Sequence, residues 1–588
     1  MTYRTHINWI PKTLLLLAVS NCAVAQQTMH TDPFGDTSAT SGGATGLQPS
    51  NNPADTERVG SGDQGKLIQF KSQTSLVQVP VVVTDRAGNH IQGLTKPDFK
   101  VLENGKPQNI ASFEEVIPAR SVVPSSTTPA GTFTNLTPDE SKPRSLTVVV
   151  LDEVNTPFLN QAYARGQLIK YLANHLDSSQ PLGLMVIGSK GLTVLSGLNS
   201  DPATLIAILK KASGKVSEME QFSNDAQAIA SAGEPPNGLL GGVSPGESPD
   251  TAVRKFILRT TAADATYSQA RAIETTLRAF LSIAWSLSGV PGRKSLVWVT
   301  GSFPFYLDSF TAVPGDNTLR ALYERTLKAL NDAQISIYPL DARGLVTDPN
   351  YSGDTAGPPS AGDTSDSLRQ SSLNSLKTFA EMTGGVAYYN TNDLASAFGR
   401  AVQDSSSYYL LSYYLDRRNN KPGWRRLQVE VSRKDAEVRA RAGYLVTDVA
   451  VNPELTHKAD VEFALLSPFE STGIPITEQW AGYVPDGSKK KIGFVLHVPA
   501  EQLINEADSN RIDIEFVAQA TNKGAAVGTV SQTIKGVIVP DTLAKLKTDG
   551  IVYRNSLSLS PGDYQVRFIV RDNLSGKIGS VIVPLIVN

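Results

Sequence analysis

The stretch TVVVLDEVNT, residues Thr147 to Thr156, decides the fold of this chain. Its unbroken run of apolar, mostly β-branched residues is typical of a strand buried on both faces, as in a parallel sheet covered by helices. The run ends in two adjacent carboxylates, an Asn and a Thr. In an open α/β sheet, ligands bind outside the carboxyl ends of the strands. This strand therefore ends either in a metal site or in the capped start of a helix.

Apolar strands and helical segments alternate after this stretch, which indicates a mostly parallel sheet with helices on both faces. The predicted strands cover residues 146–151, 182–187, 192–195, 295–300, 335–339 and 385–389. The predicted helices cover residues 158–177, 202–212, 262–288, 318–333, 372–383 and 392–404. Two loops rich in Gly, Pro, Ser and Asp, 232–250 and 345–368, are expected to be mobile surface insertions. The sequence thus predicts a doubly wound α/β domain over residues 144–405.

Two β-rich segments flank this domain, and neither is long enough to bury a core of its own. Residues 66–118 alternate short β-branched runs with turn signals. Residues 406–446 contain predicted strands of period two at 408–415, 426–433 and 438–445, which favours antiparallel pairing. We expect the two segments to form one β-sandwich into which the α/β domain is inserted. Residues 119–143, rich in Pro, Ser and Thr, are expected to be a linker.

The last part of the chain, residues 455–588, has short strands at regular spacing, separated by Asn, Gly and Asp turns. This pattern is typical of an immunoglobulin-like sandwich. The expected fold class is therefore a doubly wound α/β domain combined with immunoglobulin-like β-sandwich domains. A chain of 588 residues is also too long for one compact core, which agrees with several domains.

The N-terminus predicts export from the cytoplasm. Basic residues precede the apolar run Leu14–Val19, and Ala23-Val24-Ala25 has the small-x-small form of a signal-peptidase site. We expect residues 1–25 to be a signal peptide and residues 26–65, poor in large apolar groups, to be a disordered leader. The mature protein would then be secreted or periplasmic. Lipidation of Cys22 is the less favoured alternative, because lipoprotein signals need a small residue just before the cysteine and here that residue is the bulkier, polar Asn21.

Charge and hydropathy exclude two classes of partner. Lys plus Arg (54) nearly balances Asp plus Glu (56), so the chain lacks the basic field that attracts nucleic acid or anionic lipid. Beyond the N-terminal segment, no stretch has the ~20 apolar residues of a membrane-spanning helix. We therefore expect no nucleic-acid binding and no membrane span in the mature protein.

The motifs LTVVVLDEVNT, RKSLVWVTGS, ISIYPLDARG and LKTFAEMTGGVAYYNTNDLASAFGRAV together resemble a von Willebrand factor A-type (VWA) domain. More narrowly, the chain resembles a VWA-related group found in many secreted acidobacterial proteins. In that group, a preface like VPVVVTDRAGNHIQGLTKPDFKVLENGKPQ precedes the domain, and strands like YYLLSYYL and GWRRLQVEVSRKDAEVRARAGYL follow it. The resemblance covers about residues 76 to 446. It implies a domain that binds a protein or polymer partner.

The resemblance also implies a divalent-metal site. Such domains ligate the ion through Asp-x-Ser-x-Ser after the first strand, a loop Thr, and an Asp after the fourth strand, and a partner carboxylate completes the shell of oxygens. Here Asp152 and Thr156 match the first and last of the three motif positions, but Val154 and Gly301 stand where oxygen ligands are needed. The sequence therefore predicts a degenerate site that binds Mg²⁺ or Ca²⁺ weakly, or no cofactor at all.

Other oxygens of this motif leave alternatives open. Glu153 or Asn155 could substitute as ligands. In the competing interpretation, Asn155 or Thr156 caps the next helix with Pro157 in its first turn. Val154 favours the capping interpretation, because a cap needs one side-chain oxygen whereas a hard cation needs several.

Enzymatic signatures are weak. Gly242-Val243-Ser244-Pro245-Gly246 fits G-x-S-x-G, but it lies in a Pro- and Gly-rich loop rather than between a strand and a helix. The histidines are scattered singly and form no H-x-x-x-H pair. Asp341 follows a predicted strand, where a salt bridge to Arg343 or a turn is favoured over a catalytic role. We predict that the protein is not an enzyme.

An aromatic cluster marks the strand that follows the α/β domain. Strand alternation places Tyr408 and Tyr414 on one face and Tyr409 and Tyr413 on the other. We expect one of these sets to be core. A docking face for glycan or protein is the alternative.

The sequence as a whole favours a secreted, non-enzymatic adhesion or scaffold protein that binds another protein or an envelope or extracellular polymer. The candidate partner-binding face consists of Asp152, Glu153, Asn155, Ser302 and Asp341. The second hypothesis is an envelope structural or assembly factor whose VWA-like domain only packs. The third is a hydrolase with an unrecognised site.

Overall fold

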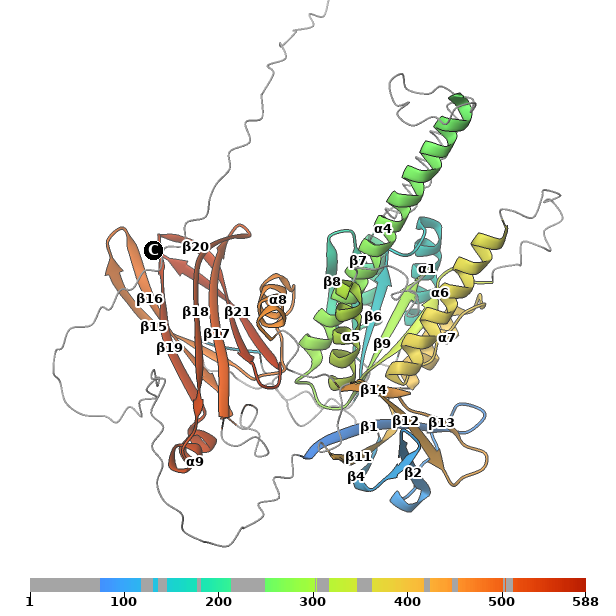
Figure 1. The fold of residues 1–588 in the computed structure, drawn as a ribbon, viewed down its shortest axis with the longest axis horizontal. Helices are drawn as coiled ribbons and strands as arrows, with labels where there is room; N and C mark the ends of the chain where they lie inside the picture. The colour runs from blue at the N-terminus through green and yellow to red at the C-terminus, as the bar shows by residue number, and fades with distance from the viewer. Residues whose placement is uncertain are drawn as a thin grey trace, which may run out of the picture. The chain divides into compact units, whose positions relative to one another are not determined.

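The structure is a computed structural model (Figure 1). The described residues are 74–117, 131–135, 145–176, 181–212, 249–301, 303, 317–345, 362–404, 406–416, 423–446, 453–500, 503 and 511–588. The predicted signal peptide, the leader and Cys22 lie outside these ranges, as do the G-x-S-x-G stretch and most of both predicted loops. What the sequence indicates for these segments stays a prediction. Within the described ranges, no helix is long and apolar enough to cross a membrane.

The α/β unit is built on one mixed sheet with strand order β10-β9-β6-β7-β8. Its strands are β6 Ser145–Asp152, β7 Leu182–Gly188, β8 Gly191–Asn199, β9 Arg293–Thr300 and β10 Ile335–Asp341. Neighbouring strands are parallel except β7 and β8, which confirms the predicted mostly parallel sheet. Because the chain moves outward from β6 to β8 and then returns to β9, a topological switch point lies between β6 and β9.

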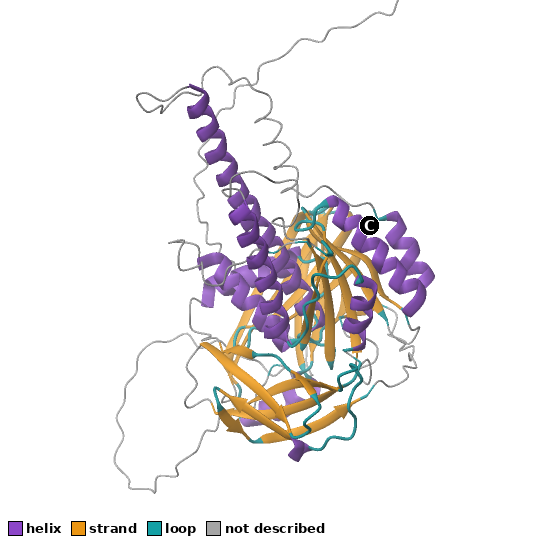
Figure 2. Ribbon diagram, turned by 90° about the vertical axis from the view of Figure 1, so that its right-hand side faces the viewer, coloured by secondary structure: helices purple, strands orange, loops and turns teal. Residues whose placement is uncertain are grey.

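Helices cover both faces of this sheet (Figure 2). One face packs against α4 Pro249–Leu287, α5 Asn317–Asp332 and α6 Gly362–Thr383. The other packs against α1 Phe158–His175, α2 Pro202–Lys211 and α7 Leu394–Gln403. Along β6, Val148 and Val150 join the first core while Val149 joins the second. A strand buried on both faces needs apolar side chains at successive positions, which explains the unbroken apolar run in the stretch Thr147–Thr156.

Three predicted elements differ from the structure. The predicted strand 385–389 is not a strand, and only an isolated parallel bridge joins Tyr388 to Leu340. At Gly385 the backbone lies so close to β10 that a Cβ there would be 1.9 Å from the Ile337 carbonyl oxygen, and its N–H donates to the Ala380 carbonyl oxygen instead of to a strand (2.8 Å). Helices α4 and α6 also begin earlier than predicted, inside the stretches assigned to loops.

The segments before and after the α/β unit form one antiparallel two-sheet unit. The preceding segment supplies β1 Thr74–Thr84, the short 3₁₀ turn η1 Lys96–Asp98, β2 Phe99–Glu103, β3 Lys106–Gln108 and β4 Ile110–Val116. The following segment supplies β11 Tyr408–Asp416, β12 Gly423–Val431, β13 Glu437–Arg439 and β14 Gly443–Val446. The two sheets, β13-β1-β11-β4 and β14-β12-β2-β3, each mix strands from both segments and share one core. The strand pairing expected across the α/β unit is therefore present.

The aromatic cluster of β11 is mainly structural. Tyr409 and Tyr413 are buried in the common core of the two sheets, as predicted for one of the two sets. Tyr408 is buried too, and its hydroxyl accepts a hydrogen bond (3.0 Å) from the backbone N–H of Arg293 at the start of β9. Tyr414 is exposed. Tyr408 and Tyr414, which share one face of the strand, thus differ in burial because Tyr408 contacts the α/β unit. Strand alternation alone could not show this difference.

The C-terminal unit also consists of two antiparallel sheets around one core. It comprises α8 Pro453–Leu466, β15 Thr477–Asp486, β16 Lys489–Val498, β17 Arg511–Asn522, β18 Ala525–Val537, α9 Pro540–Asp549, β19 Ile551–Leu559, β20 Gly562–Asp572 and β21 Ile578–Val587. The sheets are β18-β17-β20-β21 and β19-β16-β15-β5. Strand β5, Thr132–Thr134, comes from the stretch predicted to be a linker, so that prediction is wrong for these residues. The antiparallel pattern agrees with the sequence, whereas the immunoglobulin-like assignment stays a prediction.

Candidate functional site

Asp152 stands at the carboxyl end of β6, at the switch point of the sheet, and is 2% exposed. Its carboxylate accepts hydrogen bonds from the backbone N–H groups of Val154 (3.2 Å) and Asn155 (3.1 Å). It also accepts from the Asn155 amide (2.8 Å), Trp298 Nε1 (3.0 Å) and Thr300 Oγ1 (3.2 Å). Both oxygens that a VWA-type site would offer to a metal are therefore occupied by donors of the protein itself.

Burial and hydrogen bonding act on the pKa of this acid in opposite directions. Desolvation raises the pKa of Asp152, and the hydrogen bonds from Asn155, Trp298 and Thr300 offset this only in part. The direction matters for metal binding, because a hard cation needs the charged carboxylate. The surroundings of Asp152 thus disfavour the form that would ligate Mg²⁺ or Ca²⁺.

The other side of the switch point is closed by direct contact. The Gly301 N–H, just after β9, donates a hydrogen bond to Thr156 Oγ1 (2.9 Å). A Cβ at Gly301 would lie 2.9 Å from Pro157 Cδ and 3.2 Å from the Asn155 carbonyl oxygen. The position that resembles the second metal-binding Asp of the family therefore lacks room even for a methyl group. The residues of this chain do not fit a family-type metal site.

Gly301→Asp is expected to destabilise the α/β unit instead of restoring a metal site. Overpacking of a closed contact costs about 1 to 3 kcal/mol. We expect urea denaturation to show this loss equally in EDTA and in millimolar Mg²⁺. Gly301→Ala separates the effect of the Cβ from that of the added charge. Recovery of stability by Mg²⁺ in Gly301→Asp alone would contradict a closed switch point.

The capping interpretation of the motif is wrong in its details. Helix α1 begins at Phe158 with Pro157 as its N-cap. The Asn155 amide donates to Asp152 and to Thr276 Oγ1 (2.9 Å) on α4, while Thr156 Oγ1 accepts from Gly301. A buried carboxylate without donors would be far more costly than a free helix N–H at the surface, so these polar side chains turn inward.

The remaining residues of the predicted partner-binding face lie in different surroundings. Glu153 is nearly buried and lines a small pocket together with Gln161 and Arg165 of α1. Asp341 lies at the end of β10, where Arg343 binds its carboxylate through Nε (2.9 Å) and Nη2 (2.7 Å). The salt bridge favoured by the sequence is thus confirmed. Ser302 lies outside the described residues. The structure brings Asp152, Asn155 and Thr156 together, and a binding role for them stays a prediction.

An exposed apolar step borders this closed switch point. Phe158 and Leu159, the first residues of α1, are 39% and 77% exposed. Single exposed apolar residues are common on protein surfaces. Two in succession, at the start of the helix that follows β6, form a small exposed apolar rim. The sequence pattern indicated the helix but not the exposure of these two side chains.

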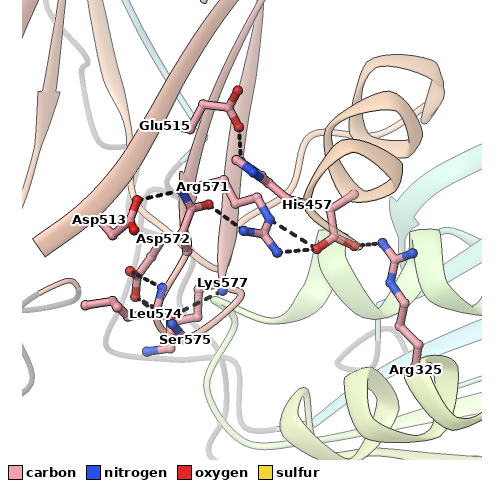
Figure 3. A network of polar contacts seen from close by, with 11 residues as sticks. Arg325, His457, Asp513, Glu515, Arg571, Asp572, Leu574, Ser575 and Lys577 are labelled. Atoms are coloured by element: carbon pink, nitrogen blue, oxygen red, sulfur yellow. Dashed lines mark hydrogen bonds and ion pairs between the residues drawn. The ribbon is translucent and has the colours of Figure 1, made fainter. Parts of the chain in front are cut away.

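A polar network that the sequence did not reveal joins α8 to α5 and β20 (Figure 3). Asp460 of α8 is 4% exposed and accepts from Arg571 Nε (3.1 Å) and Nη2 (2.6 Å). It also forms an ion pair with Arg325 of α5. One turn earlier on α8, His457 contacts the Glu515 carboxylate. A single carboxylate thus links two arginines from separate parts of the chain.

Close packing accompanies this network. The rings of Trp285 on α4 and Phe463 on α8 meet edge to face with centroids 5.2 Å apart. Ser282 and Ser467 share a hydrogen bond (2.8 Å), and Thr472 Oγ1 accepts from the N–H of Gly289 (2.8 Å). Helix α8 and the segment after it therefore dock on the α4 and α5 side of the α/β unit.

The C-terminal unit contains a buried acid of a different kind. Glu478 on β15 is 0% exposed, and neither carboxylate oxygen has a hydrogen-bond partner among the described residues. Its side chain points into the core with Ile476, and burial raises the pKa of Glu478 to about 8. The folded unit therefore favours the protonated carboxyl group.

This acid makes the C-terminal unit pH-sensitive. The pKa of Glu478 is about 8 in the folded chain against 4.5 for an exposed Glu, so its stabilising contribution is complete below pH 4.5 and is lost as the pH rises through 8. Glu478→Gln should flatten this decline and raise the stability near pH 9 by up to about 5 kcal/mol, because the pKa rises from 4.5 to about 8 on folding and each pKa unit corresponds to about 1.4 kcal/mol. Thermal unfolding from pH 5 to pH 9 measures it, with the exposed Asp486→Asn as control. An equal decline in both variants would contradict the assignment.

Comparison with known proteins gives likenesses in structure only. No family model and no curated protein matches the chain. Solved structures that resemble it include an aerotolerance-related membrane protein from Bacteroides fragilis, with 10% identity, a TM-score of 0.21, and coverage of 44% of this chain and 98% of that chain. The TFIIH p34 N-terminal domain has 12% identity, a TM-score of 0.18, and coverage of 44% and 96%. The SpRpn10 VWA domain has 12% identity, a TM-score of 0.14, and coverage of 33% and 88%. The strand order of the α/β unit is that of the doubly wound sheet expected of a VWA-like fold.

Proposed function

We propose that the chain is a secreted, non-enzymatic adhesion or scaffold protein whose VWA-like unit binds a protein or an envelope polymer without a bound metal. The observation that carries this proposal is the saturated carboxylate of Asp152, whose oxygens are taken up by donors of the chain. Binding at this edge of the sheet then depends on surface contact, and the apolar rim of Phe158 and Leu159 is the nearest surface for it.

The way in which the VWA-like unit is connected to the two-sheet unit supports a scaffold role. Strands of the two-sheet unit precede and follow the VWA-like unit, so two chain connections hold it. The Asp404 carboxylate after α7 accepts from Arg439 Nη2 of β13 (2.7 Å), and the Ala442 N–H donates to the Glu381 carbonyl oxygen of α6 (2.8 Å). A unit held by two chain connections and by these polar contacts presents its rim at a defined angle, which a single flexible linker would not do.

Two other functions compete with this proposal. In the first, the VWA-like unit is only a packing module of an envelope assembly factor, and its rim has no partner. In the second, the chain is a hydrolase with a site that the sequence motifs do not show. Screening of the full chain against ester, peptide and glycan substrate panels addresses the hydrolase.

Capture from envelope material separates adhesion from packing. The immobilised full chain is exposed to an envelope extract of the source organism, in EDTA and in Mg²⁺. We expect equal capture in both buffers and at least a tenfold loss in Leu159→Lys, because a charge placed in an apolar contact is left desolvated and unpaired. The control is Leu198→Lys at exposed Leu198 of β8. Capture unaffected by Leu159→Lys would contradict the rim, and capture abolished by EDTA would contradict metal independence.

A further inference from the structure

Strand β5 completes a sheet to which it is remote in sequence. It pairs antiparallel with the edge strand β15, with Thr134 opposite Thr477, Phe133 opposite Glu478 and Thr132 opposite Gln479. The chain thus places a short strand from between β4 and β6 on the C-terminal unit, and an edge strand covered in this way is protected from pairing with other chains.

The side chains of this segment are held specifically. The Asn135 amide donates to the carbonyl oxygens of Ser471 (2.7 Å) and Ile474 (2.9 Å), and its oxygen accepts from the Ile476 N–H (2.8 Å). Asn135 is 5% exposed. Phe133 packs against the core of the C-terminal unit. These contacts are therefore specific for an aromatic residue and, two positions later, an asparagine.

The edge of β15 is longer than its occupant. Strand β5 pairs with β15 only from Thr477 to Gln479, whereas β15 continues to Asp486. On the β5 side of this continuation, no strand pairs among the residues that the structure describes. Tyr483 and Val484 there are 61% and 64% exposed. A longer strand in the place of β5 would cover them and gain further backbone hydrogen bonds.

We propose that the edge of β15 is a binding site for an extended peptide of a partner protein, which β5 occupies within the same chain. The partner segment would carry an aromatic residue and an asparagine spaced as Phe133 and Asn135, preceded by β-branched residues that pair along β15 toward Asp486. This site is separate from the rim of the VWA-like unit and does not rest on the proposed function.

Exchange of the occupant is physically reasonable. Release of β5 breaks the three Asn135 hydrogen bonds and the Phe133 contact but leaves the two sheets otherwise paired, so it costs less than unfolding the whole unit. A tethered strand competes at an effective concentration of order millimolar, so a free peptide of equal length binds poorly. Only a longer or locally concentrated segment displaces β5. The site therefore selects partners by the length of their strand as well as by their side chains.

The test uses the full chain and two fluorescent peptides. The short one is GTFTNL, residues 131–136, and the long one has five alternating Thr and Val residues in front of it. In Phe133→Ala/Asn135→Ala, which weakens β5, we expect the long peptide to bind at least tenfold more tightly than in the unaltered chain. We also expect it to bind more tightly than the short peptide, and to lose at least tenfold when its own Asn is replaced by Ala.

Several results would overturn the proposal. Equal binding of the long peptide to both chains, or equal binding of the peptide with Ala in place of Asn, would do so. Concentration-dependent dimerisation through exchanged β5 strands, detected by light scattering, would instead identify a second copy as the occupant and overturn a partner protein. If the double variant melts at a lower temperature than the unaltered chain, Asn135→Ala alone provides the milder measurement.

Discussion

A chain that lacks residues 66–118 should lose the two-sheet unit and aggregate. The deletion removes β1, which lies between β11 and β13, and β2, which lies beside β12. It also removes the side chains Val77, Val79, Val81, Val83, Phe99 and Val101 from the common core. Each buried side chain of this kind contributes about 1.5 to 3 kcal/mol, so their sum is comparable to the whole stability of a domain. Size-exclusion chromatography and thermal unfolding measure the outcome.

The control for this deletion is the removal of residues 26–65, the predicted leader, which should leave the melting profile unchanged. A soluble, monomeric chain 119–588 that melts as the intact chain does would show that strands β11 to β14 fold without the preceding segment. That result would contradict the inserted arrangement of the VWA-like unit.

Arg293→Met should be the most damaging single substitution in the α/β unit. The buried guanidinium donates to the carbonyl oxygens of Asp404 (2.6 Å) and Gly384 (2.9 Å) and to the hydroxyls of Ser336 (3.1 Å) and Tyr338 (2.7 Å). Methionine fills the volume but leaves these acceptors without donors. We expect a loss of about 3 to 5 kcal/mol in urea denaturation.

Arg320→Met is the matched control for this substitution. Arg320 forms an exposed i,i+4 pair with Glu324 on α5, and such pairs contribute about 0.5 kcal/mol or less. Equal losses in the two variants would show that the Arg293 network does not join the start of β9 to the end of α7.

The parts of the fold that follow from burial could be predicted from the sequence. The apolar run that became β6 fixed the parallel sheet, because a strand covered on both faces has no polar side to show. The two short β-rich segments predicted a shared core because neither could bury its own apolar face. Both inferences depend only on where apolar side chains must go.

The parts that depend on one long-range contact could not be predicted. Strand β5 is three polar and aromatic residues whose partner lies far along the chain, and nothing in TFT alone distinguishes it from a linker. Asn155 and Thr156 read as helix caps because their local sequence allows it, yet the buried Asp152 and Gly301 are their partners. Local preference yields wherever a buried polar group needs those atoms.

Only part of the candidate site could be predicted from the sequence. Val154 and Gly301 in the sequence predicted a degenerate metal site. The exposure of Leu159 and the ion pairs of Asp460 could not be predicted from the sequence, because they depend on which helices lie next to each other in the fold.

Thermal unfolding of the intact chain with increasing Mg²⁺ or Ca²⁺ tests directly whether the switch point is closed by its own hydrogen bonds. A cation at 100 times its dissociation constant would stabilise the chain by about 2.7 kcal/mol. We predict no shift at millimolar concentration, in the unaltered chain or in Asp152→Ala. A clear rise in melting temperature that disappears in Asp152→Ala would show a working metal site and contradict a closed switch point.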